Sequence, residues 1–398
     1  MSTVTEQHQS RGASRLPVGV YLLAFSLFAM GSAEFLVAGV LPSVAADLDV
    51  SLSAAGALIT VFALGVVLGG PPFAVLSLRW PRRTALMTSQ LVFAAAIAVG
   101  LVADYRVLLI TRFVAGLAYA GFFAVAAVTA ISLVTPDRNA RASGVVVSGL
   151  SVAMVAGGPL GTLLSNLTEW RGGFWAVVVL TIVSTIACAL GLPATKAAVK
   201  PSLRRELTTM RKPRLWSLYA VTILSTAAYM ISFNYLAAIL ADVTGVPALW
   251  IPAVLSLFGI GAFIGLSIGG RISDRRPRHA LLIGATGIAI LSSLLATLAG
   301  HATAVVPIVF LLGIAAFVLN PAIYGRVFTI AADAPTLAGA TTVSAFQLGI
   351  SLTPVFAAAA LHLDAPVTSV SWIGVALALA TVPLVLLDRP GSAQPAGH

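Results

Sequence analysis

Twelve apolar stretches, each long enough to cross a membrane as a helix, follow one another along the chain and limit its fold more than any other feature. Each runs for roughly 18 to 25 residues, which matches the ~30 Å of hydrocarbon in a bilayer at 1.5 Å per residue. In hydrocarbon every backbone polar group has to be satisfied internally, and segments of this length achieve that as helices. We expect membrane-spanning helices at 17–41, 53–77, 84–102, 107–133, 143–165, 174–192, 215–240, 250–270, 280–299, 305–330, 338–361 and 371–387.

The composition indicates an all-α integral membrane protein. Of the 398 residues, 59% are apolar and 9% are charged, and the mean hydropathy is +1.01. A soluble domain, by contrast, is about one quarter charged. The first span is longer than the apolar core of a secretory signal and a second span follows at once, so we interpret it as an uncleaved helix. Cys188 is the single cysteine, which excludes a disulfide within the chain and a thiolate metal site.

The basic residues lie mostly in alternate loops between the spans and indicate the orientation. Lys and Arg in short loops are retained on the cytoplasmic side of a membrane. With both termini in the cytoplasm, nearly all basic loops lie inside, and the outer loops carry acids at Asp47, Asp49, Asp104, Glu169, Asp242 and Asp364. The net charge of +10 is therefore a topology signal and not a nucleic-acid-binding surface. We expect a multi-pass protein of a bacterial inner membrane.

The second half of the sequence repeats features of the first. Matching features recur after about 195 to 197 residues, namely 79–83 and 275–279, Gly116 and Gly313, and Pro159 and Pro354. Because each half crosses the membrane six times, its two ends lie on the same face, so the halves are parallel repeats related by a pseudo-two-fold axis along the membrane normal. We expect an N-terminal half, a cytoplasmic linker and a C-terminal half at 1–192, 193–214 and 215–398.

Glu34 interrupts the first apolar span with a carboxylate, and Arg112 places a cation inside the fourth. Charged groups are costly in hydrocarbon, so each is by default a functional residue. Counted from the outer ends of their spans, both lie about 10 Å deep, and we expect them to form an ion pair. A movement of Arg112 would then switch Glu34 between proton binding and release, with Glu34 also facing the substrate. The alternative is an ion pair that only cross-links two helices.

The matching positions of the C-terminal half are Ser232 for Glu34 and Val309 for Arg112, so that half lacks the ionisable pair and should serve substrate binding and gating. Aromatic side chains with a few polar groups suit a neutral amphipathic ligand. Candidate substrate contacts are Glu34, Tyr119, Tyr229, Phe233, Asn234, Asn320 and Gln347. Interhelical packing and hydrogen bonding are the alternative roles of these side chains.

Two short segments are candidate gates. Gly157, Gly158 and Pro159 should let a neighbouring helix approach closely and should bend the fifth span, as a hinge of alternating access requires. Asp274 and Arg275, after the eighth span, form either an inner gate or only a topology signal.

Three motifs resemble those of the major facilitator superfamily, specifically its twelve-helix drug/proton antiporter group, and the likeness covers nearly the whole chain. They are the basic loop 79–83 with its second copy at 270–278, the arginine-and-glycine segment 112–121, and the exporter-type segment 157–161. In the first loop Leu78 stands where the family has Asp and Pro81 where it has Gly, whereas Asp274 keeps the acid in the second copy. The resemblance therefore implies an inner charge gate on one side only.

Three segments resemble the chloramphenicol exporters of actinobacteria and their sugar-efflux relatives. They are Glu34-Phe35 ahead of Leu41-Pro42, the Arg79-Trp80-Pro81-Arg82-Arg83 form of the first basic loop, and the run 170–175. The resemblance implies a proton-coupled antiporter that exports a small amphipathic, chloramphenicol-like antibiotic by alternating access. Export of a sugar or metabolite is the alternative, and a non-transporting membrane receptor or scaffold is the rival from another class.

The expected partners are a small-molecule drug, protons and the lipid bilayer. The sequence contains no Gly-x-x-x-x-Gly-Lys-Ser/Thr loop, so ATP does not drive the protein directly. We expect no enzymatic activity, no cofactor, no metal and no nucleic acid, and a monomeric protein.

Overall fold

Each expected span is a helix in the computed structural model, which describes residues 16–76, 80–135, 138–193, 208–331 and 335–387. Within these residues twelve helical segments are long and apolar enough to cross a membrane. None of the described residues lies in a β-strand. The prediction of an all-α membrane protein with twelve spans is confirmed. The boundaries 1–192, 193–214 and 215–398 stay a prediction, because 194–207 lies outside the described residues.

The N-terminal six spans are α1 (Val18–Asp47), α2 (Leu52–Leu76), α3 (Arg82–Leu101), α4 (Tyr105–Ser132), the composite α5 (Asn139–Val152), η3 (Ala153–Gly157) and α6 (Gly158–Leu167), and α7 (Trp170–Gly191). The C-terminal six are the composite α9 (Pro213–Asn234), α10 (Leu236–Ala238) and η4 (Ile239–Val243), then α11 (Ile251–Arg275) preceded by η5 (Ala248–Trp250), α12 (Pro277–Leu298), α13 (Ala302–Ile330), α14 (Pro335–Leu361) and α15 (Ser369–Leu387). Below, N-half denotes α1–α7 and C-half α9–α15.

Three helices differ from the expected spans. α1 continues through Pro42 to Asp47 instead of ending at 41, so Glu34 lies near the middle of the helix, ~20 Å from its end. The seventh span, expected to be continuous, is interrupted at Tyr235. The fifth contains the widened π-turn η3, which ends two residues before Pro159, a residue without a backbone N–H to continue the regular hydrogen-bond ladder.

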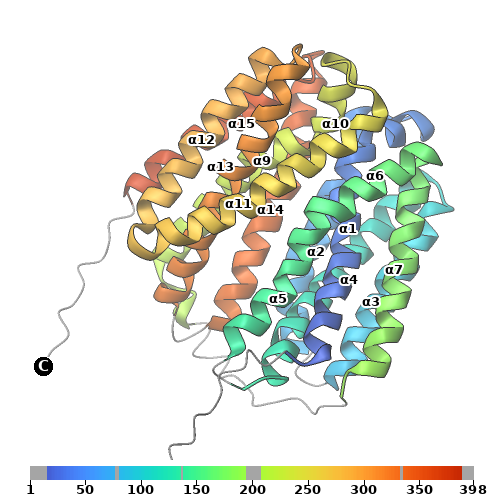
Figure 1. Cartoon of the computed structure of the whole chain (residues 1–398), viewed down its shortest axis with the longest axis vertical. Helices are drawn as coiled ribbons and strands as arrows, with labels where there is room; N and C mark the ends of the chain where they lie inside the picture. The colour runs from blue at the N-terminus through green and yellow to red at the C-terminus, as the bar shows by residue number, and fades with distance from the viewer. Residues whose placement is uncertain (1–15, 77–79, 136–137, 194–207, 332–334, 388–398) are drawn as a thin grey trace, which may run out of the picture.

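The two halves pack their helices in the same pattern. α2 crosses α4 as α11 crosses α13, α1 packs on α5 and α7 as α9 packs on α14 and α15, and α3 contacts α4 and α7 as α12 contacts α13 and α15. Figure 1 shows the N-half in blue to green on one side and the C-half in yellow to red on the other. This correspondence is the pseudo-two-fold arrangement that the sequence repeat predicts.

The repeated glycines lie where these helices cross most closely. A methyl group on Gly116 of α4 would collide with the Phe62 carbonyl of α2, and one on Gly313 of α13 would collide with the Phe258 carbonyl of α11. Small residues let helix backbones approach in this way within membranes. The same contact thus occurs at matching positions of both halves.

The halves meet along two lines of contact that also match each other. α14 of the C-half packs along α2, where Thr60 donates a hydrogen bond to the Ser351 carbonyl at 2.9 Å. α11 of the C-half packs against η3 and α6, and the Asn166 amide donates to the Ala248 carbonyl at 2.9 Å where α6 meets η5. α1 also touches α9, α10 and α11. Helices α1, α2 and α6 of the N-half therefore border the interface with the C-half.

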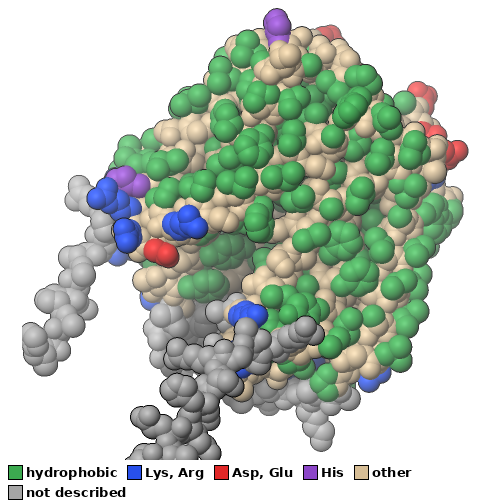
Figure 2. All heavy atoms as spheres, viewed as in Figure 1, with side chains coloured by type: hydrophobic (Ala, Val, Ile, Leu, Met, Phe, Trp, Pro, Cys, Tyr) green, Lys and Arg blue, Asp and Glu red, His purple; other side chains and the backbone are tan. Residues whose placement is uncertain are grey.

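Charged side chains separate toward the two ends of the molecule. Figure 2 shows Lys and Arg gathered at one end and most of the visible Asp and Glu at the other, with an apolar surface between them. The same view shows the surface hollowed between the halves near the basic end. The contact of Asn166 with Ala248 joins α6 to η5 at the acidic end, whereas the surface between the halves is hollowed toward the basic end.

A cluster around Asp47 ties the last turn of α1 to α7 at the acidic end. Trp170 Nε1 donates to Asp47 Oδ2 at 2.9 Å, and Arg171 Nη1 forms an ion pair with the same oxygen at 2.7 Å. Arg171 also donates to the Leu101 carbonyl of α3 at 3.0 Å, and its guanidinium lies 4.5 Å from the centre of the Trp170 ring. The run 170–175 noted in the sequence therefore joins three helices of the N-half.

We expect Asp47→Ala to lower the stability of the folded protein by about 1 to 2 kcal/mol, chiefly through the lost hydrogen bonds. The ion pair itself adds little, since Asp47 is 44% exposed and water screens the charges. Thermal unfolding in detergent measures the change. Asp242→Ala, which removes an exposed carboxylate of η4, is the control, and equal melting temperatures for the two variants contradict the role of the cluster.

Candidate functional site

Glu34 makes its hydrogen bond to the opposite half of the protein. Gln347 Nε2 of α14 donates to Glu34 Oε1 of α1 at 2.9 Å. Gln347 is buried, whereas Glu34 is partly accessible although it lies midway along its helix. A carboxylate that is deep in the molecule and still accessible borders the space between the halves. This contact joins two predicted site residues that are 313 positions apart in the sequence.

Arg112 approaches the same turn of α1 but does not meet the Glu34 carboxylate directly. Its Nη1 donates to the Ala33 carbonyl at 3.5 Å, and no ion pair within 4.0 Å joins these two described side chains, so the expected direct pair is not formed. The physical reason is the helical rotation of about 100° between neighbouring residues, which turns Ala33 toward α4 and Glu34 toward α14. The two charges still attract each other across this distance.

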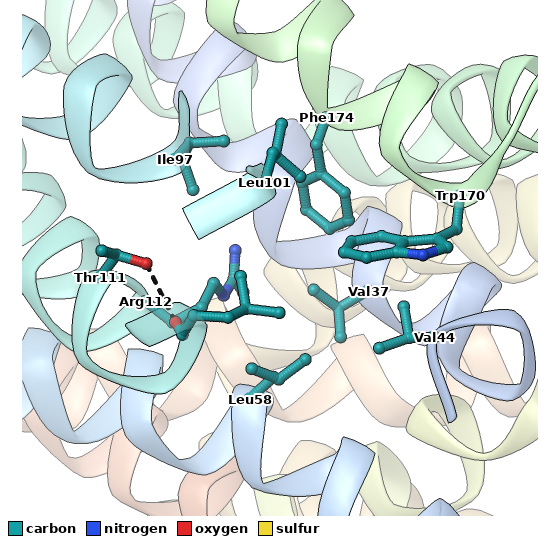
Figure 3. Close-up of a pocket in the computed structure, with 10 residues that line it drawn as sticks. Val37, Val44, Leu58, Ile97, Leu101, Thr111, Arg112, Trp170 and Phe174 are labelled. Atoms are coloured by element: carbon teal, nitrogen blue, oxygen red, sulfur yellow. Dashed lines mark hydrogen bonds between the residues drawn. The ribbon is translucent and has the colours of Figure 1, made fainter. Parts of the chain in front are cut away.

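Aromatic rings and aliphatic side chains surround the Arg112 guanidinium. Its central carbon lies 4.6 Å from the centre of the Phe62 ring and 5.8 Å from that of Phe174. Figure 3 shows Arg112 pointing toward Phe174, with Trp170 closing the other side of a small apolar cavity of about 10 Å³. The Arg112 Nε atom is buried without a described hydrogen-bond partner. Cation–π contacts of Arg112 with Phe62 and Phe174 thus take the place of the predicted ion pair with the Glu34 carboxylate.

A chain of aromatic rings crosses from α1 into the C-half beside Glu34. Phe35 packs edge-on against Phe233 with ring centres 6.4 Å apart, and Phe233 lies 4.6 Å from Phe258. The chain continues through Phe317 to Tyr229 at 5.6 Å. The predicted contacts Tyr229 and Phe233 therefore belong to one aromatic cluster.

Tyr324 of α13 is a site residue that sequence reasoning missed. It is partly accessible, it stacks on Phe346 with ring centres 5.5 Å apart, and it lies close to both Tyr119 and Tyr229. Tyr324 lies one helical turn after the candidate Asn320, and this spacing could have identified it from the sequence. Tyr119 and Tyr229 thus bring two phenol groups near Glu34, and Tyr324 lies beside both of them.

The two predicted asparagines differ in their surroundings. Asn234 donates to Thr353 at 2.8 Å within the C-half, so its amide is engaged in joining α9 to α14. Asn320, at 9% exposure, lies beside the Tyr229 hydroxyl. Ser232, which takes the place of Glu34 in the repeat, is buried against Ser371, and Val309, which takes the place of Arg112, is buried as well.

The glycines of the fifth span lie directly against α1 at the level of Glu34. A methyl group on Gly157 would collide with Ser32, and one on Gly158 would collide with Phe35. The other side of η3 meets Gly259 of α11 in the C-half. The expected close approach is confirmed, and the gating role of Gly157, Gly158 and Pro159 stays a prediction.

Asp274 and Arg275 end α11 at the basic end and are exposed. Asp274 forms no ion pair with a described residue. The loop it would face through the repeat, 77–79, lies outside the described residues. Their role as an inner gate therefore stays a prediction.

The described residues contain no group of three or more His, Cys, Asp or Glu that could hold a metal ion. Cys188 is buried and lies 3.4 Å from the Ser26 hydroxyl, so it serves packing between α7 and α1.

Comparison with known proteins agrees with this architecture. The Major Facilitator Superfamily profile matches residues 23–354. A chloramphenicol resistance protein of Streptomyces lividans is 40% identical over 351 residues, covering 87% of this chain and 90% of the relative. A chloramphenicol efflux pump of Mycobacterium tuberculosis is 28% identical, covering 88% and 86%. A bacterial homologue of the human lysosomal transporter Spinster, solved in an inward-facing and occupied conformation, superposes with a TM-score of 0.69 at 19% identity, covering 94% and 95%.

Two pseudo-symmetric six-helix halves with a polar and aromatic site between them define a membrane transporter. The chain belongs to the Major Facilitator Superfamily.

Proposed function

We propose that this transporter exports a small amphipathic antibiotic of the chloramphenicol type in exchange for protons, by alternating access between its two halves. The observation that carries the proposal is Glu34, an ionisable, partly accessible carboxylate in the middle of α1 that is hydrogen-bonded to Gln347 of the opposite half. A group that binds a proton and touches both halves can link proton movement to their rocking. The relative at 40% identity supports the substrate class.

The polarity of the site favours an amphipathic drug over a sugar. A sugar needs several free hydrogen-bonding groups, but Asn234 is engaged by Thr353 and Gln347 by Glu34. The accessible rings that remain are Tyr324 and Phe346, with Glu34 as the polar contact, whereas most rings of the Phe35-to-Tyr229 chain are buried. An apolar lining with few polar groups is what a neutral amphipathic molecule requires.

The arrangement of the halves fits one stage of an alternating-access cycle. They are joined at the acidic end by Asn166 and Ala248, and the surface between them is hollowed toward the basic end. The positive-inside rule assigns the basic end to the cytoplasm, together with both termini. In this proposal a monomer in the bacterial inner membrane takes up the drug from the cytoplasmic side, with α5–η3–α6 as the hinge between α1 and α11.

Transport into vesicles tests the proposal. Purified protein is reconstituted into liposomes, a pH gradient is imposed, and uptake of labelled chloramphenicol is followed with and without an uncoupler. We expect gradient-driven uptake that the uncoupler abolishes, together with drug-dependent proton movement. Sugar transport without chloramphenicol transport would replace the substrate assignment, and chloramphenicol uptake that ignores the gradient would exclude antiport.

We expect Tyr324→Ala to raise the KM for chloramphenicol about tenfold, which corresponds to ~1.4 kcal/mol of lost binding. The change removes an accessible ring at the site, and aromatic contacts contribute on this scale. Transport kinetics in the same vesicles measure it. Tyr21→Ala, which removes an exposed ring near the start of α1, is the matched control, and an unchanged KM for the Tyr324 variant would remove Tyr324 from the binding site.

A further inference from the structure

We propose that Gln347 senses the proton on Glu34: the protonated acid and the amide form a two-point pair that holds α1 against α14, and loss of the proton removes one of its two hydrogen bonds. The inference rests on the proposed role of Glu34 as the proton carrier and adds the device by which the second half responds. Gln347 is a positioning residue in this scheme, since it acts through Glu34.

The structure contains one of the two hydrogen bonds of such a pair and lacks the other. Gln347 Nε2 donates to Glu34 Oε1 at 2.9 Å. Gln347 Oε1, on the same amide, is buried and no described residue donates a hydrogen bond to it. A buried acceptor without a donor is costly, so the site is incomplete as long as Glu34 offers no proton.

Protonation of Glu34 supplies the missing donor. A carboxylic acid carries one O–H donor and one C=O acceptor on neighbouring atoms, and a primary amide carries an acceptor and donors in the matching positions. The acid O–H donates to Gln347 Oε1 while Gln347 Nε2 continues to donate to the other carboxyl oxygen. The ionised carboxylate is an acceptor only, so it leaves Gln347 Oε1 unpaired and faces it with a negative charge.

The groups around Glu34 divide between its two protonation states. The Nε2–H donor of Gln347 and the Arg112 guanidinium of α4 both favour the ionised carboxylate. The titratable side chains that also face it, Tyr119 of α4 and Tyr229 of α9, are phenols and carry no charge at neutral pH. The Gln347 Oε1 atom, in contrast, gains a donor only from the acid. Protonation therefore weakens the attraction of Arg112 within the N-half and adds a second hydrogen bond to the opposite half.

The pair joins the halves because its two helices belong to different ones. Ser351, one turn after Gln347 on α14, accepts the hydrogen bond from Thr60 of α2, so this face of α14 lies against the N-half. A rocking motion that separates α1 from α14 cannot keep both hydrogen bonds of an acid–amide pair. Protonated Glu34 thus favours the arrangement seen here, with the acidic end closed.

Distance measurement between the halves tests this without any drug. Spin labels are placed at the exposed Leu167 of α6 and Leu249 of η5, at the closed end, in a Cys188→Ser background of the full chain in lipid nanodiscs. We expect acidification to raise the ratio of short to long distances between the labels roughly tenfold. A tenfold shift corresponds to the free energy gained when one buried hydrogen-bond acceptor receives a donor. In Gln347→Leu the response should fall below about twofold.

Three variants separate this device from a general loss of structure. The exchanged pair Glu34→Gln with Gln347→Glu rebuilds an acid–amide pair with the roles reversed and should restore the pH response. Glu34→Gln alone forms an amide–amide pair and should stay closed at every pH. Gln90→Leu removes a buried amide that is bonded to Ser184 within the N-half and should keep the wild-type response.

Retention of the wild-type response by Gln347→Leu would overturn the inference, as would a folded exchanged pair without pH response. If Glu34→Gln abolishes the response and Gln347→Leu does not, the proton carrier stands and only the sensing role of Gln347 fails. If Glu34→Gln itself responds to pH as the wild type does, the proposed proton coupling through Glu34 fails and the inference falls with it.

Discussion

Glu34→Gln should reduce proton-driven export to the background of vesicles without the protein, while the variant still folds and reaches the membrane. The amide cannot take up and release a proton, yet it has nearly the shape of the acid and keeps the contact with Gln347. Because antiport moves the drug only when a proton moves the other way, the loss should be complete at any pH gradient. Uptake of labelled chloramphenicol into proteoliposomes under an imposed pH gradient measures it.

The same variant should retain drug binding, which separates a coupling defect from a damaged site. Equilibrium binding of chloramphenicol to the purified variant, within a few-fold of wild type, is the expected second result. Glu169→Gln, which neutralises an exposed carboxylate just before α7, is the matched control and should export normally. Undiminished gradient-driven export by Glu34→Gln would remove Glu34 from the coupling mechanism.

The spans and the repeat could be predicted because both are properties of the chain itself. Apolar length decides whether a helix crosses a membrane, and the recurrence of Gly116 as Gly313 follows from sequence alone. The expected first span ends at 41, directly before Pro42, whereas the helix tolerates this proline and continues to Asp47. That shift moved Glu34 from near one surface to the middle of the span.

The sequence identifies the polar residues that lie near Glu34, but it does not show which of them bonds to the Glu34 carboxyl group. Glu34, Arg112 and Gln347 stand out as polar groups in apolar spans, and the structure brings all three to one region. Which pair forms depends on helix rotation and on how α14 packs along α2, and neither leaves a periodic signal in the sequence. The sequence favours an ion pair of Glu34 with Arg112, whereas in the structure the Gln347 amide across the interface binds the Glu34 carboxyl group.

Gly116→Ala and Gly313→Ala should each lower stability by about 1 to 3 kcal/mol, although each adds a single methyl group. The new carbon would collide with a backbone carbonyl of the crossing helix, Phe62 in one half and Phe258 in the other. A backbone carbonyl cannot rotate away as a side chain can, so the helices have to separate. Thermal unfolding in detergent, followed through the reaction of buried Cys188 with a thiol reagent, measures both losses.

The opposite sign is expected at two other helical glycines, which makes the comparison sharp. A methyl group on Gly144 of α5 or on Gly270 of α11 would meet no described atom within 4 Å. In a helix interior alanine is favoured over glycine by up to about 1 kcal/mol, so Gly144→Ala and Gly270→Ala should be neutral or stabilising. Similar losses at all four positions would mean that backbone flexibility and not close helix crossing explains the glycines. Unequal losses of stability in Gly116→Ala and Gly313→Ala would show that the two helix crossings, although built on one pattern, contribute unequally to the stability of the protein.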